Sequence, residues 1–368
     1  MKIGILTMYR SGNYGATLQA YATKQAINEN NFGEAEIINY CSDAVKQKID
    51  RRFIKKAGLF GTAVACVEKI YYHPRMKKVN AFIDSYAPAG QLKKEELAAL
   101  SDRYDIFLSG SDQIWNPQIQ QGDYSYLLDF VDDPKKKRSY GSSFGTRVIS
   151  DEYKDDYKKL LSDYQRLTVR EAAGVELIGE LIGREADLVV DPALLLSPAQ
   201  WESKLPSRKF KGKFVFAYQM AHSSLIAKVV GKARRHFGSR AVFVPFPILG
   251  VCKCRPALNL SSLEWLRAIH DSEFVVTDSF HGAVFSIIFK KQFYYIITSD
   301  TVRKRLSRLE TLLDSLGISD RLVDDVSKCD FDARIDYDEV HKKLDALRER
   351  SLSILKELVT DEVEQNQE

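Results

Sequence analysis

Short apolar segments typical of buried strands alternate with helical patterns along most of this chain, and this alternation restricts the fold more than any other feature. Residues 2–7 are followed by apolar residues at helical spacing over 18–26, and residues 214–218 are followed by a second such pattern over 224–237. Strands that alternate with helices predict parallel sheets, because parallel neighbours need a crossover connection that a helix supplies. We therefore expect an α/β protein. Further strands are predicted at 35–40, 104–110, 138–145, 166–171, 186–192, 241–246, 273–278 and 292–297, and further helices at 151–163, 174–182, 263–270, 282–289 and 306–316.

The chain of 368 residues is longer than one hydrophobic core usually holds, which predicts two domains. The polar, lysine-containing stretch 197–213 separates the two strand–helix series and is the predicted linker. We expect doubly wound, Rossmann-like domains over 1–197 and 198–328, with their sheets facing a cleft. A long amphipathic helix follows in 329–368, and packing back on the N-terminal domain is one arrangement for it.

The positive charge is concentrated in one segment. The whole chain has a net charge of +4, whereas residues 51–78 carry eight Lys or Arg residues against one Glu. Basic flanks around the apolar stretch 57–66 fit a segment that lies on an anionic membrane surface. They also fit the more common case, a solvated helical excursion over 51–80. Basic residues are not interleaved with aromatic residues along a face, so a nucleic-acid partner is not expected.

The sequence contains no pattern that requires a metal or a cofactor. Cys252 and Cys254 are the closely spaced pair among five scattered cysteines, and C-x-C alone lacks the second ligand pair of a zinc site. The loop after the first strand is not G-x-G-x-x-G, so a dinucleotide site is not supported. Every apolar run is shorter than the roughly 18 residues of a membrane span, and no signal peptide precedes residues 2–7. We expect a cytoplasmic protein, with the inner face of the plasma membrane as an alternative place through the basic segment.

His281 is the first candidate for chemistry. It follows the predicted strand 273–278 and opens a helix whose free N–H groups attract anions. Histidine titrates near neutrality, which suits general acid–base catalysis. The alternative is a capping turn in which Asp278 or Ser279 caps the helix and His281 is only structural.

Arg170 and Asp112 also follow predicted strands, whose carboxyl ends are the places where ligands bind in parallel sheets. The guanidinium fork of Arg170 suits a carboxylate or phosphate, and a local pair with Glu171 is an equally good interpretation. Asp112 suits a base or an acceptor of hydroxyl hydrogen bonds. Trp115, three residues later, suits stacking on a sugar ring, unless it lies in the core behind a capped helix start.

Several motifs, taken in order, resemble those of the polysaccharide pyruvyl transferase family. They are Gly12-Asn13-Tyr14-Gly15-Ala16-Thr17-Leu18-Gln19, Gly110-Ser111-Asp112-Gln113-Ile114-Trp115-Asn116, Thr168-Val169-Arg170-Glu171, Val190-Asp191-Pro192, and Thr277-Asp278-Ser279-Phe280-His281-Gly282 with Lys290-Lys291-Gln292-Phe293 after it. The resemblance implies a GT-B-like fold of two Rossmann-like domains. It also implies transfer of a pyruvyl group from phosphoenolpyruvate to a sugar of a bacterial surface polysaccharide or its lipid-linked precursor, with formation of a cyclic ketal.

The resemblance assigns roles to individual residues. His281 would bind phosphoenolpyruvate and act as the general acid, and Arg170 would hold the carboxylate or phosphate of this co-substrate. Ser279 and Gly282 would lie against the same donor, and Asp112 is our candidate for the base that activates a sugar hydroxyl. The residues expected to contact the sugar acceptor are Asn13, Tyr14, Trp115, Asn116, Ser142 and Ser143.

One position departs from the family pattern. Many members have an arginine two places before the histidine, in a Ser-Arg-x-His-Gly motif, whereas this chain has Ser279 there. If that arginine normally grips the donor, another cation must replace it. The candidates are Arg308 first, then Arg303 and Arg305, which follow the next predicted strand.

Two other functions compete with pyruvyl transfer. A GT-B glycosyltransferase that uses a nucleotide sugar would need a residue to hold the ribose, and no Glu stands out for that task. A glycan-binding protein without catalysis could use the same fold, although the presence of both His281 and Arg170 favours an enzyme.

Overall fold

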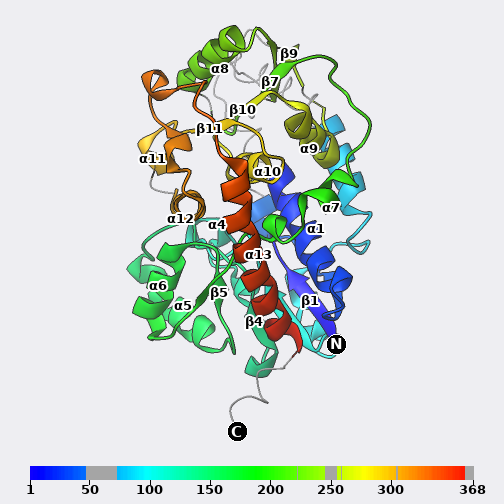
Figure 1. Cartoon of the computed structure of the whole chain (residues 1–368). Coiled ribbons are helices and arrows are strands. Elements are labelled where there is room, and N and C mark those ends of the chain that lie inside the picture. Colours follow the sequence, from blue (N-terminus) through cyan, green and yellow to red (C-terminus); the bar gives the residue numbers. More distant parts are fainter. Residues whose placement is uncertain (47–72, 222, 245–254, 258, 304–305, 361–368) are drawn as a thin grey trace, which may run out of the picture.

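The computed structural model describes residues 1–46, 73–221, 223–244, 255–257, 259–303 and 306–360. It contains two main parallel sheets, one from each half of the chain, which lie in the lower and upper parts of Figure 1. Most of the basic segment 51–78 lies outside the described residues, so its membrane contact stays a prediction. No helix of the described part has the length and apolar character needed to cross a membrane.

The N-terminal sheet has four parallel strands in the order β2-β1-β3-β4. These strands are β1 (Lys2–Leu6), β2 (Glu34–Ile37), β3 (Ile106–Ser109) and β4 (Lys137–Ser139). Parallel bridges between Arg138 and Arg166 and between Ser142 and Val169 extend it toward a further parallel pair, β5 (Thr168–Val169) and β6 (Asp187–Leu188). Helices of this half include α1 (Tyr14–Glu29), α4 (Pro117–Gln120), α5 (Asp151–Ser162) and α6 (Ala172–Ile182).

The C-terminal sheet has six parallel strands in the order β12-β11-β10-β7-β8-β9. Counted from β7, this is the strand order of dinucleotide-binding Rossmann domains. The strands are β7 (Phe214–Tyr218), β8 (Arg240–Val244), β9 (Arg255–Pro256), β10 (Phe274–Thr277), β11 (Phe293–Ile296) and β12 (Leu322–Val323). The helices of this half are α8 (Ser224–His236), α9 (Ser262–Asp271), α10 (Phe280–Ile288), α11 (Asp300–Arg303) and α12 (Ser307–Leu316).

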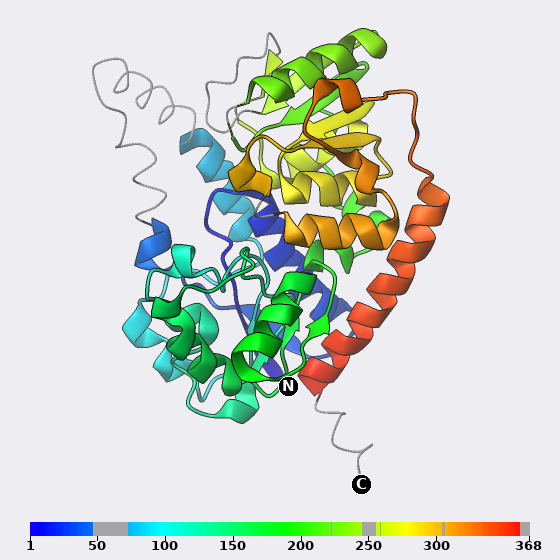
Figure 2. The ribbon, with the colours of Figure 1, turned by 90° about the vertical axis from the view of Figure 1, so that its left-hand side faces the viewer.

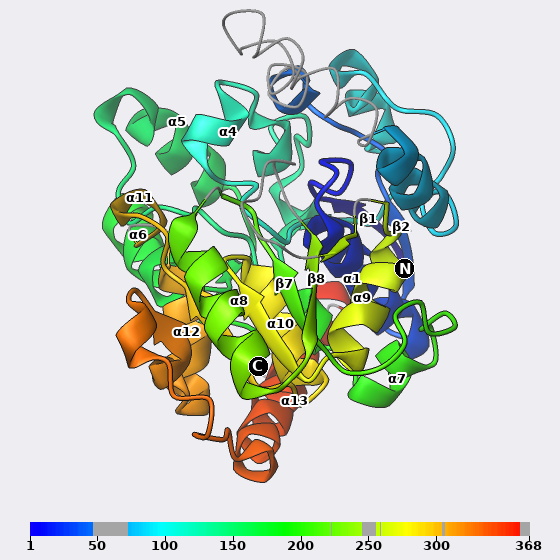
Figure 3. The ribbon, with the colours of Figure 1, turned by 90° about the horizontal axis from the view of Figure 1, so that it is seen from above.

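Helices cover both faces of the C-terminal sheet, as Figure 3 shows from above. Val215 and Ala217 of β7 pack in the same core cluster as α8, whereas Phe214 and Phe216 pack with α9 and α10. Both faces of the strand are therefore buried. This explains why β7 is a continuous apolar run in the sequence rather than an alternation of apolar and polar residues.

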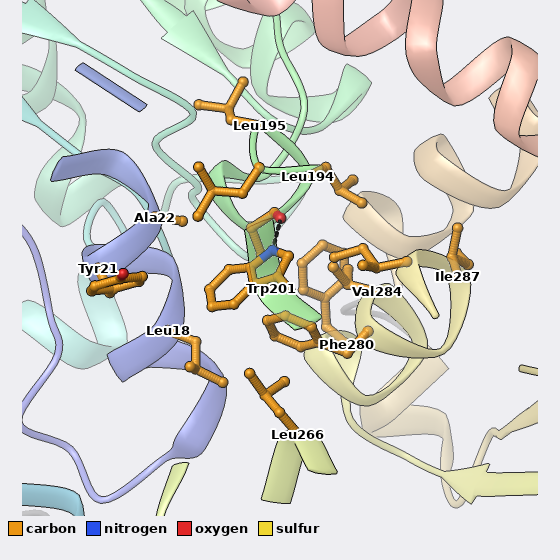
Figure 4. Packing of buried hydrophobic residues seen from close by; sticks show 14 of the residues in the cluster. Leu18, Tyr21, Ala22, Leu194, Leu195, Trp201, Leu266, Phe280, Val284 and Ile287 are labelled. Carbon is orange, nitrogen blue, oxygen red and sulfur yellow. Dashed lines mark hydrogen bonds between the residues drawn. The ribbon is translucent and has the colours of Figure 1, made fainter. Parts of the chain in front are cut away.

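Trp201 lies where the two halves meet. It belongs to the short helix α7 (Pro198–Glu202), is fully buried, and donates its indole N–H to the carbonyl of Ala193 at 2.9 Å. Its ring centroid lies 5.9 Å from that of Tyr21 in α1 (Figure 4) and 5.1 Å from that of Phe285 in α10. The predicted linker 197–213 thus begins as part of the shared core.

The C-terminal helix α13 (Tyr337–Thr360) runs along both halves of the molecule, as Figure 2 shows. On the N-terminal half, Ser351 Oγ accepts a hydrogen bond from the backbone N–H of Val190 at 3.1 Å. On the C-terminal half, His341 Nε2 lies 2.9 Å from the carbonyl oxygen of Ile287. The helix therefore holds the two halves in a fixed relation beside the cleft.

Candidate active site

A cavity of about 350 Å³ lies between the two halves, at the carboxyl ends of both sheets. In each sheet this edge includes the point where the strand order reverses, between β1 and β3 and between β7 and β10. Such switch points are the usual ligand sites of open α/β sheets. The polar residues that line the cavity are Ser11, Asn13, Asp112 and Gln113 from the N-terminal half and Asp278, Ser279, His281, Tyr295 and Arg308 from the C-terminal half.

His281 lies in the first turn of α10 and reaches across to the N-terminal half. Ser279 is the N-cap of this helix, and its Oγ accepts from the N–H of Gly282 at 3.4 Å. The imidazole is buried, with Nε2 3.5 Å from Oδ2 of Asp191. Nε2 makes no hydrogen bond to any described residue. Nε2 of His281 thus lies near the carboxylate of Asp191 without a hydrogen bond to it.

Gly15 makes the position of the His281 ring possible. The N-cap residue Asn13 accepts a hydrogen bond from the N–H of Gly15 at 3.0 Å, which fixes the start of α1. A Cβ atom at Gly15 would lie only 2.1 Å from Cγ of His281. The glycine of the N-terminal motif is therefore required by close packing between the two halves.

We expect Gly15→Ala to push the His281 ring from its place and to lower the free energy of unfolding by about 1–3 kcal/mol, as overpacking does. Urea denaturation measures this change. Gly179→Ala is the matched control, because no heavy atom lies within 4 Å of a Cβ at that position in α6. The control should be neutral or stabilising by up to about 1 kcal/mol. Equal stability of the two variants would contradict the packing argument.

Arg170 is buried between two carboxylates. It donates to Oδ1 of Asp112 at 2.7 Å and to Oδ2 of Asp191. Burial by itself raises the pKa of Asp191, but the neighbouring His281 and Arg170 together hold it well below the ordinary value. Burial likewise raises the pKa of Asp112, and Arg170, His281 and Arg308 outweigh this and lower it. The fork of Arg170 is thus engaged by protein carboxylates, so it orders the site rather than presenting its donors to a ligand.

Arg308 of α12 supplies the arginine charge that faces the cavity. It donates to Oδ1 of Asp112 at a distance of 3.3 Å, which is long for a hydrogen bond to a carboxylate. Its guanidinium carbon also lies 5.0 Å from the centroid of the Phe280 ring. Burial and the nearby Arg170 lower its pKa, so a bound anion would relieve an unfavourable concentration of positive charge. Arg308, the first candidate for a replacement at Ser279, therefore lies at the cavity.

Asp278 lines the cavity. In the sequence analysis it was one of two alternative caps for the helix that follows. Ser279 caps α10, and Asp278 instead reaches across to the end of β7. Its two oxygens accept hydrogen bonds from the N–H groups of Met220 at 2.6 Å and Ala221 at 2.8 Å. Burial raises the pKa of Asp278 to about 6, although the backbone N–H groups act in the opposite direction.

Tyr14 and Trp115 lie in the core, away from the cavity, which corrects their expected contact with a sugar. Trp115 is fully buried and donates its indole N–H to Oγ of Ser109 at 3.1 Å. Tyr14 is also fully buried, donates to the carbonyl of Leu260 and stacks on Trp265 with centroids 5.4 Å apart. Both aromatic rings stabilise the walls behind the site.

Asn116, Ser142 and Ser143 are likewise buried and engaged within the protein. The side chain of Asn116 caps α4, and Ser142 donates to a backbone carbonyl at 2.9 Å. Ser143 donates to Oε1 of Glu171 at 2.8 Å. Of the residues predicted to contact the acceptor, Asn13 is the one that lines the cavity.

Gly282 and Arg303 do not have the surroundings expected for contacts with phosphoenolpyruvate. A Cβ at Gly282 would lie 2.5 Å from Oγ1 of Thr277, so this glycine allows α10 to pack on β10 rather than a ligand to approach. Arg303 is exposed and pairs with Asp324 at 2.7 Å, outside the cavity. Arg305 lies outside the described residues.

The arrangement is suited to an anionic ligand. Arg308 and His281 face the cavity, and the helices α1 and α10 both begin at its wall, where backbone N–H groups favour negative charge. Among the described residues, no three His, Cys, Asp or Glu side chains are grouped as a metal site requires.

Comparison with known proteins places the chain in a family. No curated protein sequence matches it significantly. A Listeria monocytogenes structure described as a UDP-N-acetylglucosamine 2-epimerase aligns with a TM-score of 0.52 and 9% identity, over 98% of this chain and 91% of the other. A glycosyltransferase from Rickettsia africae aligns with a TM-score of 0.47 and 10% identity, over 98% and 99% of the two chains. Identities this low bear on the fold alone, and the predicted GT-B-like architecture is confirmed. The model of the polysaccharide pyruvyl transferase family matches residues 13–300, and the chain therefore belongs to this family of transferases.

Proposed function

We propose that this protein transfers the pyruvyl group of phosphoenolpyruvate to two hydroxyls of a sugar in a bacterial surface polysaccharide or its lipid-linked precursor, forming a cyclic ketal. The observation that carries the proposal is that His281, at the N-terminus of α10, and Arg308 of α12 line one cavity between the two halves. Phosphoenolpyruvate carries a carboxylate and a phosphate. A cavity with these cations and helix-end N–H groups fits such a ligand.

In this proposal His281 is the general acid. Protonation of the methylene carbon by the imidazolium makes C2 of phosphoenolpyruvate electrophilic, and a sugar hydroxyl then attacks C2. The second hydroxyl closes the ketal as phosphate leaves. Asp191, whose Oδ2 lies 3.5 Å from Nε2, stabilises the positive charge of the imidazolium before the transfer.

Arg308 is the proposed donor anchor, and Asp112 and Arg170 position it. Asp112 accepts hydrogen bonds from both arginines, which lower its pKa and with it the strength of this carboxylate as a base. Asp112, the candidate base from the sequence, is therefore a weak base in this setting. We propose that another group accepts the proton of the sugar hydroxyl.

We expect Arg308→Met to raise the KM for phosphoenolpyruvate and to lower kcat/KM by about 10- to 100-fold, the effect of losing one hydrogen bond to a charged group. Steady-state phosphate release measures both constants. Arg303→Met is the matched control, since Arg303 lies outside the cavity and pairs with Asp324 at the surface. Equal effects of the two substitutions would remove Arg308 from the donor site.

The proposed function is tested by phosphate release from phosphoenolpyruvate in the presence of a panel of free and lipid-linked sugars. We expect release that depends on a sugar with two neighbouring hydroxyls. If no sugar supports release while a nucleotide sugar is consumed, the protein is a glycosyltransferase of the same fold. If neither substrate is consumed while a glycan binds, the protein is a glycan-binding protein of the same fold.

A further inference from the structure

Asp278 occupies a position in the cavity that the donor chemistry leaves unused. It follows β10, three residues before His281, and lines the same cavity while remaining largely buried. Each of its carboxylate oxygens accepts one backbone N–H, from Met220 and from Ala221. A carboxylate oxygen can accept a second hydrogen bond, so the group is held in a fixed orientation with acceptor capacity remaining on both oxygens.

The carboxylate of Asp278 has no cationic partner among the described residues. In this it differs from Asp112 and Asp191, which both pair with Arg170. Burying a carboxylate without a cation costs stability, and the backbone N–H groups offset this cost only in part, since the pKa of Asp278 is still raised to about 6. Groups kept in such an unfavourable state are typical of functional sites.

The cavity contains charged groups of both signs. Arg308, Asp112 and Asp278 all line it, and Asp112 is paired with Arg308, whereas Asp278 has no cation beside it among the described residues. Tyr295 of β11 is close enough to Asp278 and Arg308 that, besides burial, the charge of Asp278 raises its pKa and the charge of Arg308 lowers it. A trianionic donor would be repelled by Asp278. Neutral hydroxyl groups, in contrast, are good donors to a fixed carboxylate.

We propose that Asp278 binds the acceptor sugar through two of its hydroxyls and takes the proton of the hydroxyl that attacks the donor. The inference rests on the proposed function and adds the acceptor class, a neutral sugar with two adjacent hydroxyls. Both hydroxyls of the future ketal can donate to one carboxylate, which orients them toward the same carbon atom.

The proton transfers balance over the reaction. In the first step the hydroxyl oxygen forms a bond to C2, its proton passes to Asp278, and His281 gives a proton to the methylene carbon, which becomes a methyl group. In the second step the bond from C2 to the phosphate oxygen breaks with its electron pair, and the second hydroxyl adds to C2. The proton of the second hydroxyl restores the imidazolium of His281. The proton on Asp278 leaves with the departing phosphate as hydrogen phosphate.

The test compares Asp278→Asn with the wild type in phosphate release. We expect kcat/KM for the acceptor to fall by about 100-fold or more, the usual loss for a positioned base. The Kd for phosphoenolpyruvate should stay unchanged or fall, because the neutral side chain no longer repels the donor. A base works in its ionised form, so wild-type kcat/KM should rise as pH rises through about 6, until His281, the proposed acid, loses its proton. This rise should be absent in Asp278→Asn. Asp324→Asn, at a surface carboxylate paired with Arg303, is the control and should behave like the wild type.

Each outcome decides the inference. It is overturned if Asp278→Asn keeps wild-type kcat/KM for the acceptor, keeps the rise near pH 6, or loses affinity for phosphoenolpyruvate instead. If that variant does not fold, Asp278→Glu is used instead, because it keeps the charge. The proposal is supported if Asp278→Glu keeps the wild-type pH dependence near 6 and has an altered KM for the acceptor. It is overturned if either result is absent. Failure of the wild type to release phosphate with any sugar is a different result, because it contradicts the proposed function itself.

Discussion

Replacing His281 with alanine is expected to lower the rate of phosphate release from phosphoenolpyruvate by about 10²- to 10⁴-fold, which is the contribution of a positioned general acid. In the proposed mechanism the imidazole protonates the methylene carbon, and His281 lines the cavity at the start of α10. Single-turnover experiments at saturating phosphoenolpyruvate measure the chemical step without the contribution of product release.

His236→Ala is the control for this substitution. His236 lies at the end of α8, partly exposed and 3.4 Å from Asp332, and does not line the cavity. The control should release phosphate at the wild-type rate. A fully active His281→Ala protein would show that the histidine is structural. That is the alternative in which this segment is only the capping turn of a helix, with Asp278 or Ser279 as the cap.

Arg170→Met is expected to have the largest effect on stability, about 3–5 kcal/mol in the free energy of unfolding. Removing the guanidinium leaves Asp112 and Asp191 as buried carboxylates without their main partner. Urea denaturation measures the loss. Arg147→Met is the control, because Arg147 and Glu310 form an exposed pair, and such pairs contribute about 0–1 kcal/mol.

The loss in Arg170→Met should depend on pH in a defined direction. In the wild type the pKa values of Asp112 and Asp191 are held below the ordinary value, so their contribution to stability is present above that value and is lost as the pH falls through the folded pKa. Without Arg170 these carboxylates take up protons at higher pH. The difference between the two proteins should therefore shrink as the pH falls toward about 4. A difference that is small at neutral pH, or that grows on acidification, would contradict the assigned pairs.

The fold could be predicted from the sequence because both faces of its strands are buried. Residues 214–218 and 274–276 are continuous apolar runs, and the structure has β7 and β10 there. The strands β9 and β12, of two residues each, were not predicted. The helix predicted at 306–316 is α12, and Gly317 follows it in the left-handed conformation, with φ 74°.

The site could be predicted only in part, because a strand end shows where a residue lies but not which way its side chain points. His281, Asp112 and Arg308 do meet in one cavity. Ser142 follows a strand equally closely, yet its hydroxyl turns back to the protein backbone. Asp278 was overlooked for the same reason: its pattern suits a helix cap, and its contact with β7 depends on residues far away in the sequence.

Gly282 was expected to lie against the donor, and the surroundings of Gly282 and Gly15 give a different reason for these two glycines. Gly15 makes room for the His281 ring and Gly282 for Thr277. Both contacts join elements that are distant in the sequence, so no local pattern could reveal them. The family motif thus encodes the packing that holds the histidine in place as well as the histidine itself.

The central claim, that a pyruvyl group from phosphoenolpyruvate ends as a ketal on a sugar after protonation by His281, is tested most directly by a reaction in D₂O with phosphoenolpyruvate labelled with ¹³C at C2. Mass spectrometry and NMR of the sugar should show the labelled ketal carbon and one deuterium in its methyl group, and neither should form with His281→Ala. A sugar that stays free of ¹³C while a nucleotide sugar is consumed would contradict the account.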